Sequence, residues 1–341
     1  MLTNAVGQDS KHGLDAMSGC MTVAVANTDT NSTRTAHSNL QSAGATSSSP
    51  RQPSGWLRGI LVSVIVTAIG IAVGWAGGQG GAELLDMPLV LVATGTAFLV
   101  QWIVFVPSYL KQTEHYYDLT GSLTYQLLTW GTLIAAGTYA PRQLLLGSMV
   151  AVWSGRLGLF LFLRVKRAGK DGRFDAIKTA GGRFLVFWSV QGLWVVLTMA
   201  TVLSVLALPS SAPLGVLDGI GAAIWAVGFA IEVIADRQKA AFKANPANAG
   251  RFINVGLWSW SRHPNYFGEI VLWIGVALIA VGDLEGWRLV TLVSPVFVFW
   301  LLFSVSGIPL LAARADERWG KDQDYQAYKA RTSLLVPRPP R

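Results

Sequence analysis

The segment Phe184–Leu208 reads FLVFWSVQGLWVVLTMATVLSVLAL and contains no charged residue. A transmembrane helix needs about 20 consecutive apolar residues, so this segment is long enough to cross a bilayer. Pro209 and Pro213 follow it and end the helix, because proline lacks a backbone N–H and blocks helical continuation. The sequence therefore predicts a membrane-spanning helix over this segment.

Comparable apolar segments recur from Trp56 to the C-terminal region. The predicted spans are Trp56–Gly77, Met87–Leu110, Thr120–Tyr139, Leu144–Leu163, Phe184–Leu208, Leu214–Ile234, Tyr266–Val281 and Leu289–Leu311. The 341-residue chain is 52% hydrophobic and only 13% charged, whereas soluble domains carry about 25% charged residues. We therefore predict an all-α, polytopic membrane bundle of about seven to eight helices, over residues 56–341.

Residues 1–55 differ in composition from the rest of the chain. They are rich in Ser, Thr, Asn, Ala and Gly and contain few large apolar residues. Such a segment buries too little surface to offset the entropy of ordering, so we predict a disordered tail. A transit peptide is the alternative, because the tail is Ser/Thr-rich and poor in acidic residues.

The basic residues lie in alternate loops. Loops 78–86 and 209–213 contain no Lys or Arg, and loop 140–143 contains one, whereas loop 164–183, loop 235–265 and the C-terminal tail are strongly basic. Positive charge is retained on the cytoplasmic side of membranes, so both termini are expected to face the cytosol. A bacterial inner membrane and the endoplasmic reticulum both suit this topology. The net charge of +8 thus reflects topology and anion binding rather than nucleic-acid binding.

The segment Gly256–Ile270, GLWSWSRHPNYFGEI, places polar side chains at the start of an apolar run. Other polar residues follow the sixth and eighth spans, and loops on one side of a bundle can fold together. Arginine matches phosphate oxygens in bidentate fashion, and aromatic faces suit a purine ring. We therefore expect one nucleotide-binding pocket on this side. The candidates are Asp236, Arg237, Lys243, Arg251, Asn254, Arg262, His263, Asn265 and Arg314.

Other site classes have less support. The alternative for each basic residue is ordinary positive-inside charge. No P-loop, GxGxxG turn, GxSxG motif or His/Cys metal spacing occurs, so we predict a nucleotide held by helices and no metal. Among the spans, Arg156 stands out as an ionisable residue. It either pairs within the bundle or contacts a phosphate or substrate in a cavity.

Four motifs, in the same order and on a matching hydropathy profile, carry a family resemblance. They are RAGKDGRFDAIK (Arg167–Lys178), ADRQKAAFKANPANAGRFINVGLW (Ala235–Trp258), RHPNYFGEI (Arg262–Ile270) and LLAARADERWGKDQDYQAYKARTSLLVP (Leu310–Pro337). From about Tyr117 to Pro337 the chain resembles the steroid 5α-reductase C-terminal domain family, and most closely its bacterial-type relatives, the domain-of-unknown-function 1295 group.

The resemblance implies an NADPH-dependent membrane reductase acting on the activated C=C bond of a lipid or steroid-like enone. Its cofactor-binding half would cover about residues 214–337. The resemblance supports Asp236, Arg262, Asn265 and Arg314 as cofactor residues, and it adds Tyr266 and Glu269.

The catalytic pair of the steroid-reducing relatives does not align with this chain. Those enzymes use a Glu and a Tyr from N-terminal helices, and the nearest candidates here are Asp118 and Tyr125 in YYDLTGSLTY. A tyrosine hydrogen-bonded to a carboxylate can protonate the carbonyl oxygen, where negative charge develops. The alternative is that Asp118 caps the third span and Tyr125 lies in an interfacial belt.

Two further functions compete with the reductase. The RHPxYxG motif and the tail ending in LLVP also resemble the isoprenylcysteine carboxyl methyltransferases, which bind S-adenosylmethionine. Those enzymes have a Glu-Glu pair before the tail, whereas this chain has Asp316 and Glu317 in a different setting. A non-enzymatic membrane lipid-binding protein is the other alternative. In each case the expected partners are membrane lipids and a hydrophobic small molecule or lipid.

Overall fold

The structure, a computed structural model, describes residues 55–168 and 177–339. The predicted N-terminal tail lies outside the described residues, apart from Gly55, and so does part of the loop after the fourth span. The helices are α2 (Gly55–Gly77), α3 (Leu89–Leu110), α4 (Tyr117–Ala136), α5 (Pro141–Ala168), α6 (Gly181–Leu206), α7 (Val216–Ala244), α8 (Pro264–Ala280), α9 (Val293–Trp300), α10 (Ile308–Trp319) and α11 (Gln323–Arg331). The prediction of a helical membrane bundle is confirmed.

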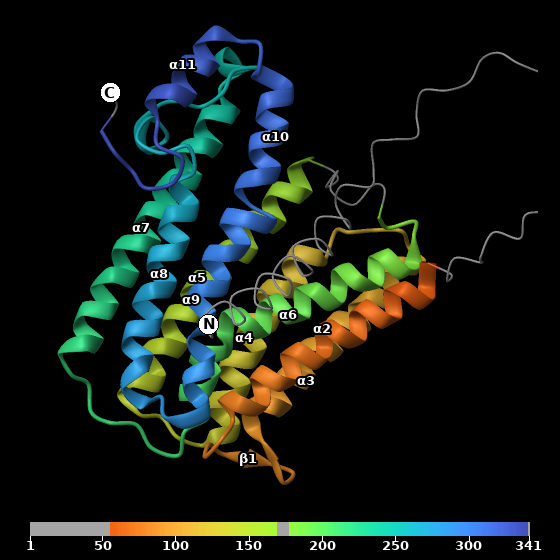
Figure 1. The fold of residues 1–341 in the computed structure, drawn as a ribbon, viewed down its shortest axis with the longest axis vertical. Coiled ribbons are helices and arrows are strands. Elements are labelled where there is room, and N and C mark those ends of the chain that lie inside the picture. The colour runs from red at the N-terminus through yellow and green to blue at the C-terminus, as the bar shows by residue number, and fades with distance from the viewer. Residues whose placement is uncertain (1–54, 169–176, 340–341) are drawn as a thin grey trace, which may run out of the picture.

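Seven helical segments in the described ranges are long and apolar enough to cross a membrane. They correspond to seven of the eight predicted spans. The exception is α4, which carries Thr, Ser and Gln on many of its turns and hydrogen-bonds several of them inside the bundle. Successive helices run in alternating directions, except that α9 and α10 continue one another, so α2 begins and α10 ends on the same side of the bundle (Figure 1).

The central helix is α6, the most buried of the seven candidate membrane spans in the described ranges. Almost all of its side chains from Gln191 to Leu206 are buried, and it contacts α2, α3, α4 and α9. Phe184 and Trp188 are fully buried near its start. A helix that is apolar on every face is stable only when other helices or lipid surround it, and here helices do so.

Helices α7 and α8 pack through four glycines with heptad spacing. Gly221 and Gly228 lie on α7, and Gly268 and Gly275 lie on α8. A Cβ atom on Gly228 would lie 2.6 Å from the carbonyl oxygen of Gly268, and a Cβ atom on Gly275 would lie 2.6 Å from that of Gly221. Small residues allow membrane helices to approach this closely. The close crossing fixes the positions of the polar side chains on both helices.

The predicted last span, Leu289–Leu311, is not one continuous α-helix. It begins as a 3₁₀ helix (Gly286–Leu292), continues as α9, widens into a π-helical turn (Leu301–Val305) and restarts as α10. Gly307 and Pro309 mark the restart, because proline cannot continue the preceding hydrogen-bond ladder. The predicted span thus corresponds to one helical segment, Gly286–Trp319, that changes helix type along its length and extends farther than predicted.

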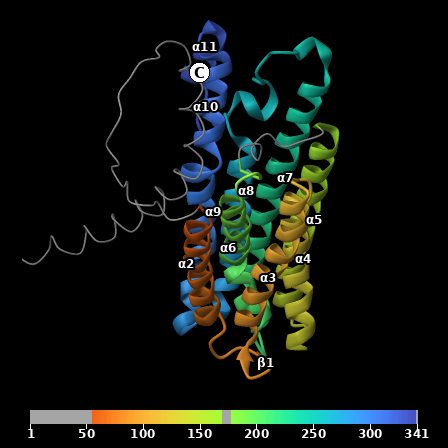
Figure 2. The ribbon, with the colours of Figure 1, turned by 90° about the vertical axis from the view of Figure 1, so that its right-hand side faces the viewer.

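A small hairpin was also missed by the all-α prediction. Strands β1 (Glu83–Leu84) and β2 (Met87–Pro88) pair antiparallel between α2 and α3. Leu85 and Asp86, at the turn, both have positive φ angles, as a tight two-residue hairpin turn requires. The hairpin lies at one end of the bundle, and α10, α11 and the C-terminal end of α7 lie at the other (Figures 1 and 2).

A buried arginine joins three helical segments at the hairpin end of the bundle. Arg142, in the first turn of α5, donates to both carboxylate oxygens of Asp218 on α7, at 2.7 and 2.9 Å. It also donates to Asp283, which follows α8, at 2.6 Å. Arg142 and Asp218 are 6% and 3% exposed. In the sequence, Arg142 was noted only as the single basic residue of its loop. In the structure it links α5 to α7 and to the segment after α8.

Candidate functional site

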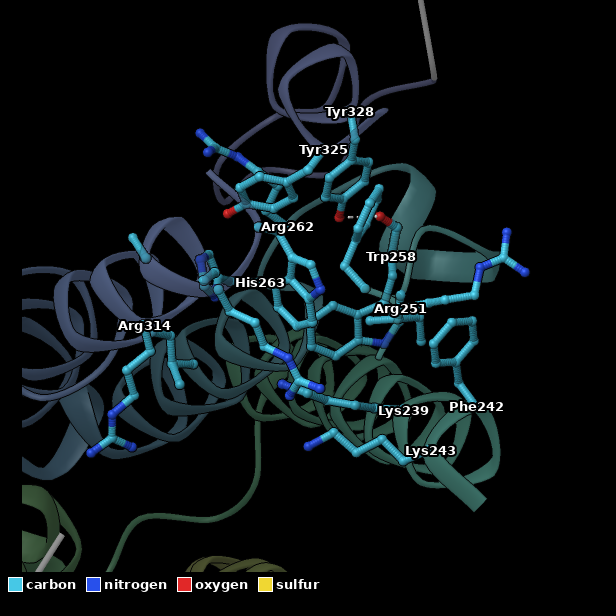
Figure 3. Close-up of a pocket in the computed structure, with 17 residues that line it drawn as sticks. Lys239, Phe242, Lys243, Arg251, Trp258, Arg262, His263, Arg314, Tyr325 and Tyr328 are labelled. Carbon is cyan, nitrogen blue, oxygen red and sulfur yellow. Dashed lines mark hydrogen bonds between the residues drawn. The ribbon is translucent and has the colours of Figure 1, made fainter. Parts of the chain in front are cut away.

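A cavity of about 340 Å³ lies at the end of the bundle opposite the hairpin. It is enclosed by the end of α7, the loop 245–263, α10 and α11 (Figure 3). Its lining residues are Lys239, Phe242, Lys243, Arg251, Phe252, Ile253, Trp258, Arg262, His263, Leu311, Ala312, Arg314, Ala315, Arg318, Trp319, Tyr325 and Tyr328. We call it the basic cavity.

Hydrogen bonds to backbone carbonyls hold the loop and the C-terminal helices around this cavity. The indole of Trp258 donates to the Ala235 carbonyl at 2.9 Å, and the Tyr328 hydroxyl donates to the Trp258 carbonyl at 2.7 Å. Farther along, the Arg262 backbone N–H donates to the Ser333 carbonyl at 2.8 Å. The walls of the cavity, which come from three separate parts of the sequence, are therefore tied to one another.

The charge of the cavity is uniformly positive. None of its described lining residues is Asp or Glu. Six are cationic, namely Lys239, Lys243, Arg251, Arg262, Arg314 and Arg318. Asp316 lies close enough to interact with Arg262, but it forms an ion pair with Lys329 at 2.6 Å. Several cations around one hollow repel each other, and a bound anion relieves that repulsion. The cavity is therefore suited to an anionic ligand.

Two buried nitrogen atoms in the cavity wall point to a missing polar partner. Within the described part of the chain, Arg262 Nε and His263 Nδ1 are buried and have no hydrogen-bond partner. Buried polar atoms are almost always paired in folded proteins, so an unpaired one calls for a ligand, ion or water. Both residues precede α8, and His263 stacks parallel on Tyr266 with ring centroids 5.6 Å apart.

Burial, and after it the positive charges of Lys239 and Arg262, together lower the pKa of His263 to about 4. The side chain is 8% exposed. His263 is therefore neutral at physiological pH, and one of its two ring nitrogens accepts a hydrogen bond while the other donates.

The protein is expected to lose stability in mild acid because of His263. The unfolded chain binds a proton at His263 below about pH 6.5, but the folded protein does so only near pH 4. Stability from this residue is therefore complete above pH 6.5 and falls by about 3 kcal/mol as the pH is lowered to 4. Thermal unfolding in detergent from pH 7.5 to 4.5 should show a weaker acid dependence in His263→Gln than in wild type or His115→Gln. Equal dependence in all three proteins would contradict the assignment.

The structure brings five of the predicted cofactor residues into the basic cavity, namely Lys243, Arg251, Arg262, His263 and Arg314. The other six do not line it. Arg237 is exposed on α7, and Asn254 and Asn265 are half-buried outside the lining. Tyr266 stacks on His263, which lines the cavity. Asp236 and Glu269 belong to a different cluster, deeper in the bundle.

That deeper cluster surrounds Arg156 of α5, whose guanidinium is paired with Glu232 and Asp236 of α7. The interpretation that Arg156 pairs within the bundle is confirmed. Glu232 lies inside the predicted sixth span and was overlooked, although it is 2% exposed. Its Oε2 atom has no hydrogen-bond partner among the described residues. The cluster therefore also has capacity for a polar ligand atom or water.

One face of α7 connects the deep cluster to the basic cavity. Glu232, Asp236, Lys239 and Lys243 are spaced by four, three and four residues, so their side chains lie on the same face of the helix. At 1.5 Å per residue this stripe is about 16 Å long. It runs from two carboxylates inside the bundle to two ammonium groups in the cavity wall.

The candidate catalytic tyrosine lies beside the deep cluster. Tyr125 packs edge-on against Trp153 of α5, with ring centroids 5.1 Å apart, and Trp153 packs edge-on against Trp273 of α8 at 5.1 Å. The Tyr125 side chain also interacts with Thr198 and electrostatically with Glu269. Asp118 is seven residues away on α4, about 10 Å along the helix axis. Glu269 of α8 is thus within electrostatic range of Tyr125.

Several residues of the site were missed at the sequence level. Lys239 could have been predicted as a site residue, because its spacing from Lys243 places both side chains on one helix face. Phe252, Tyr325 and Tyr328 form an aromatic group, with ring centroids 5.2 and 5.3 Å from Phe252. Tyr325 and Tyr328 belong to the C-terminal motif, but nothing local in the sequence indicates that they close the cavity.

A family model described as a protein of unknown function, DUF1295, matches residues 104–332. The chain belongs to this family. The matched region runs from the end of α3 to the end of α11 and includes the basic cavity and the deep cluster. Helix α2 and most of α3 lie outside it.

Two curated proteins are similar to parts of the chain. A probable O-methyltransferase, ustE, of Ustilaginoidea virens is 34% identical over 27% of this chain and 30% of its own length. A 3-oxo-5-alpha-steroid 4-dehydrogenase 1 of Bos taurus is 28% identical over 34% of this chain and 40% of its own length. The chain thus spans less than half of either relative. No solved structure matches.

Proposed function

We propose that this membrane protein is an NADPH-dependent reductase of an activated C=C bond in a lipid or steroid-like enone. The observation that carries the proposal is the basic cavity, with its six cationic lining residues, its aromatic wall and two buried nitrogen atoms without partners. A steroid dehydrogenase among the similar proteins agrees with this reaction class.

The charge of the cavity favours NADPH over S-adenosylmethionine. NADPH carries a pyrophosphate and a 2′-phosphate, and these groups match arginine and lysine side chains. S-adenosylmethionine carries a sulfonium cation and a zwitterionic amino acid, so its net charge is positive. Six cations without a carboxylate in the described lining would repel it. The methyltransferase is retained as the second candidate because an O-methyltransferase is also among the similar proteins.

The residues of the basic cavity fit the phosphate-bearing part of the cofactor. Arg262 and Arg251 would hold phosphate oxygens, and His263 would accept or donate one hydrogen bond as a neutral imidazole. Trp258 and Tyr328 offer aromatic faces for a purine. When bound, the reduced nicotinamide supplies a hydride to the β-carbon of the enone.

Tyr125 would hold and deliver the proton. As hydride adds to the β-carbon, negative charge develops on the enone carbonyl oxygen, and an acid positioned there lowers the barrier. Tyr125 lies inside the bundle, packed on Trp153 and next to the deep cluster. The surrounding apolar helices would exclude water and admit a lipid from the bilayer. Asp118 is the predicted partner of Tyr125.

The topology that follows from this proposal places the basic cavity in the cytosol. The cavity end of the bundle carries most of the loop arginines and lysines, and the positive-inside rule assigns that end to the cytoplasmic face. The cofactor would then enter from the cytosol, where NADPH is supplied, and the cofactor-binding half would be residues 214–337.

Replacing Arg262 by alanine is expected to weaken NADPH binding by about 10- to 100-fold, because a charge-assisted contact contributes about 1.5–3 kcal/mol. Quenching of tryptophan fluorescence by NADPH measures the dissociation constant. The matched control is Arg338→Ala, an exposed arginine at the same end of the molecule and outside the cavity lining. Equal affinities of the two variants for NADPH would refute the site. Binding of S-adenosylmethionine in preference to NADPH would support the methyltransferase.

A further inference from the structure

The segment that follows α11 lies against the loop that precedes α8. The backbone N–H of Arg262 donates to the Ser333 carbonyl at 2.8 Å, and the backbone N–H of Arg338 donates to the Trp260 carbonyl at 3.0 Å. The two segments run side by side in parallel orientation. We call residues 332–338 the C-terminal strap.

The hydroxyl of Ser261 joins the C-terminal strap to the start of α8. It donates to the Leu335 carbonyl at 2.7 Å and accepts from the backbone N–H of His263 at 3.1 Å. Ser261 is 0% exposed, so both bonds form away from bulk water. A buried N–H that loses its partner keeps the full cost of leaving water, so this hydroxyl matters for the local backbone. Ser261 itself does not line the basic cavity.

These bonds fix the two cavity residues whose buried nitrogen atoms have no partner among the described residues. Arg262 and His263 lie between Ser261, which the strap holds, and Pro264, the first residue of α8. This two-residue stretch is therefore held at both ends. A binding site whose side chains are already held in place loses less entropy when the ligand binds.

The strap also opposes the electrostatic repulsion inside the empty cavity. Lys239 and Arg262 line the same hollow and repel each other until an anion binds. A loop held only by its own residues could move Arg262 outward and relieve this repulsion. The bond from the Arg262 backbone to Ser333 restrains that movement. The cavity therefore stays ready for an anion at the expense of unrelieved repulsion.

We propose that the C-terminal strap preorganises Arg262 and His263 for a phosphate or pyrophosphate group, and that Ser261 is a positioning residue of the basic cavity. The inference rests on the anion-binding role that the proposed function gives this cavity. Ser261 acts on the ligand through its two neighbours. The strap acts through backbone N–H and C=O groups.

Titration of the full chain in nanodiscs with inorganic pyrophosphate, followed by calorimetry, tests the inference without the redox reaction. Ser261→Ala is expected to bind pyrophosphate about 5- to 10-fold more weakly than wild type, the factor that one lost hydrogen bond gives. An affinity of Ser261→Ala within about twofold of wild type would overturn the inference.

The matched control is Ser294→Ala. Ser294 of α9 is 1% exposed and lies outside the cavity lining. Like Ser261, its hydroxyl donates to a backbone carbonyl, that of Leu197 at 2.8 Å, and accepts from a backbone N–H, that of Thr201 at 3.1 Å. This variant loses the same kinds of bond, so it should be destabilised to a similar degree and keep the wild-type affinity for pyrophosphate. An equal loss of affinity in both serine variants would show a general structural effect and overturn the assignment of Ser261.

A second pair of variants acts on the strap itself and does not depend on the folding of Ser261→Ala. Arg338→Pro removes the backbone N–H that donates to the Trp260 carbonyl, whereas Arg338→Ala keeps it. Arg338→Pro should bind pyrophosphate about 5-fold more weakly, and Arg338→Ala should bind it as the wild type does. Equal affinities of these two variants would overturn the role of the strap.

Cofactor kinetics separate this inference from the proposed function. In Ser261→Ala the KM for NADPH should rise by about 5- to 10-fold and kcat should stay within about twofold of wild type, because saturating cofactor refills the site. Ser294→Ala should change neither value. An unchanged KM together with an unchanged pyrophosphate affinity in Ser261→Ala would refute the inference alone. A wild type that binds pyrophosphate but not NADPH would refute the proposed function alone.

Discussion

A Tyr125→Phe variant is expected to reduce the enone about 10²- to 10⁴-fold more slowly than the wild type, the usual contribution of a positioned acid. The substitution removes one hydroxyl and keeps the ring that packs on Trp153. The bundle should therefore fold normally and bind NADPH with unchanged affinity. Stopped-flow measurement of NADPH oxidation under single-turnover conditions gives the rate of the chemical step.

The control for this prediction is Tyr139→Phe. Tyr139 lies beyond the end of α4 and is exposed, so it should keep the wild-type rate. A Tyr125→Phe variant with a rate within about twofold of wild type would show that another group protonates the carbonyl oxygen. The interfacial-belt interpretation of Tyr125 would then be preferred.

Replacing Arg142 by alanine is expected to lower the free energy of unfolding by about 3–5 kcal/mol, because it leaves two buried carboxylates without their cation. Asp218 and Asp283 both lose a partner, at 2.7 and 2.6 Å respectively. Thermal or denaturant unfolding in a fixed detergent measures the loss. NADPH binding by the fraction that remains folded should not change, because Arg142 lies at the opposite end of the bundle from the basic cavity.

Removing the carboxylates as well tests the physical cause. The triple variant Arg142→Met, Asp218→Asn, Asp283→Asn has no buried charge and should recover part of the lost stability. The exposed control Arg338→Ala should stay within about 0.5 kcal/mol of wild type. If the triple variant is as unstable as Arg142→Ala, packing rather than unpaired charge explains the loss.

The membrane architecture could be predicted from the sequence because it depends on local composition. The span predicted over Trp56–Gly77 corresponds to α2 (Gly55–Gly77), and the one over Phe184–Leu208 corresponds to α6 (Gly181–Leu206). The length of an apolar segment is enough to predict such a helix. It does not indicate where the helix changes type or what connects it to the next one, so the π-helical turn before Gly307 and the hairpin at Leu85 were not predicted.

The site could be predicted only where its residues share a local motif. Arg262 and His263 stand in aromatic sequence before a span, and they do line the basic cavity. Arg156 and Glu232 are 76 positions apart, and no local pattern links them. Their pairing depends on how α5 packs near α7. Tyr125 likewise interacts with Thr198 of α6 and electrostatically with Glu269 of α8, and no local pattern on α4 indicates either contact.

The most direct measurement of the central claim is oxidation of NADPH by the purified protein in nanodiscs, followed by absorbance, with a panel of lipid enones and with S-adenosylmethionine as a competitor. The account predicts enone-dependent loss of NADPH, a saturated C–C bond in the recovered lipid and no effect of S-adenosylmethionine. The account would be contradicted if NADPH stayed intact with every enone while S-adenosylmethionine was consumed in methyl transfer to a lipid.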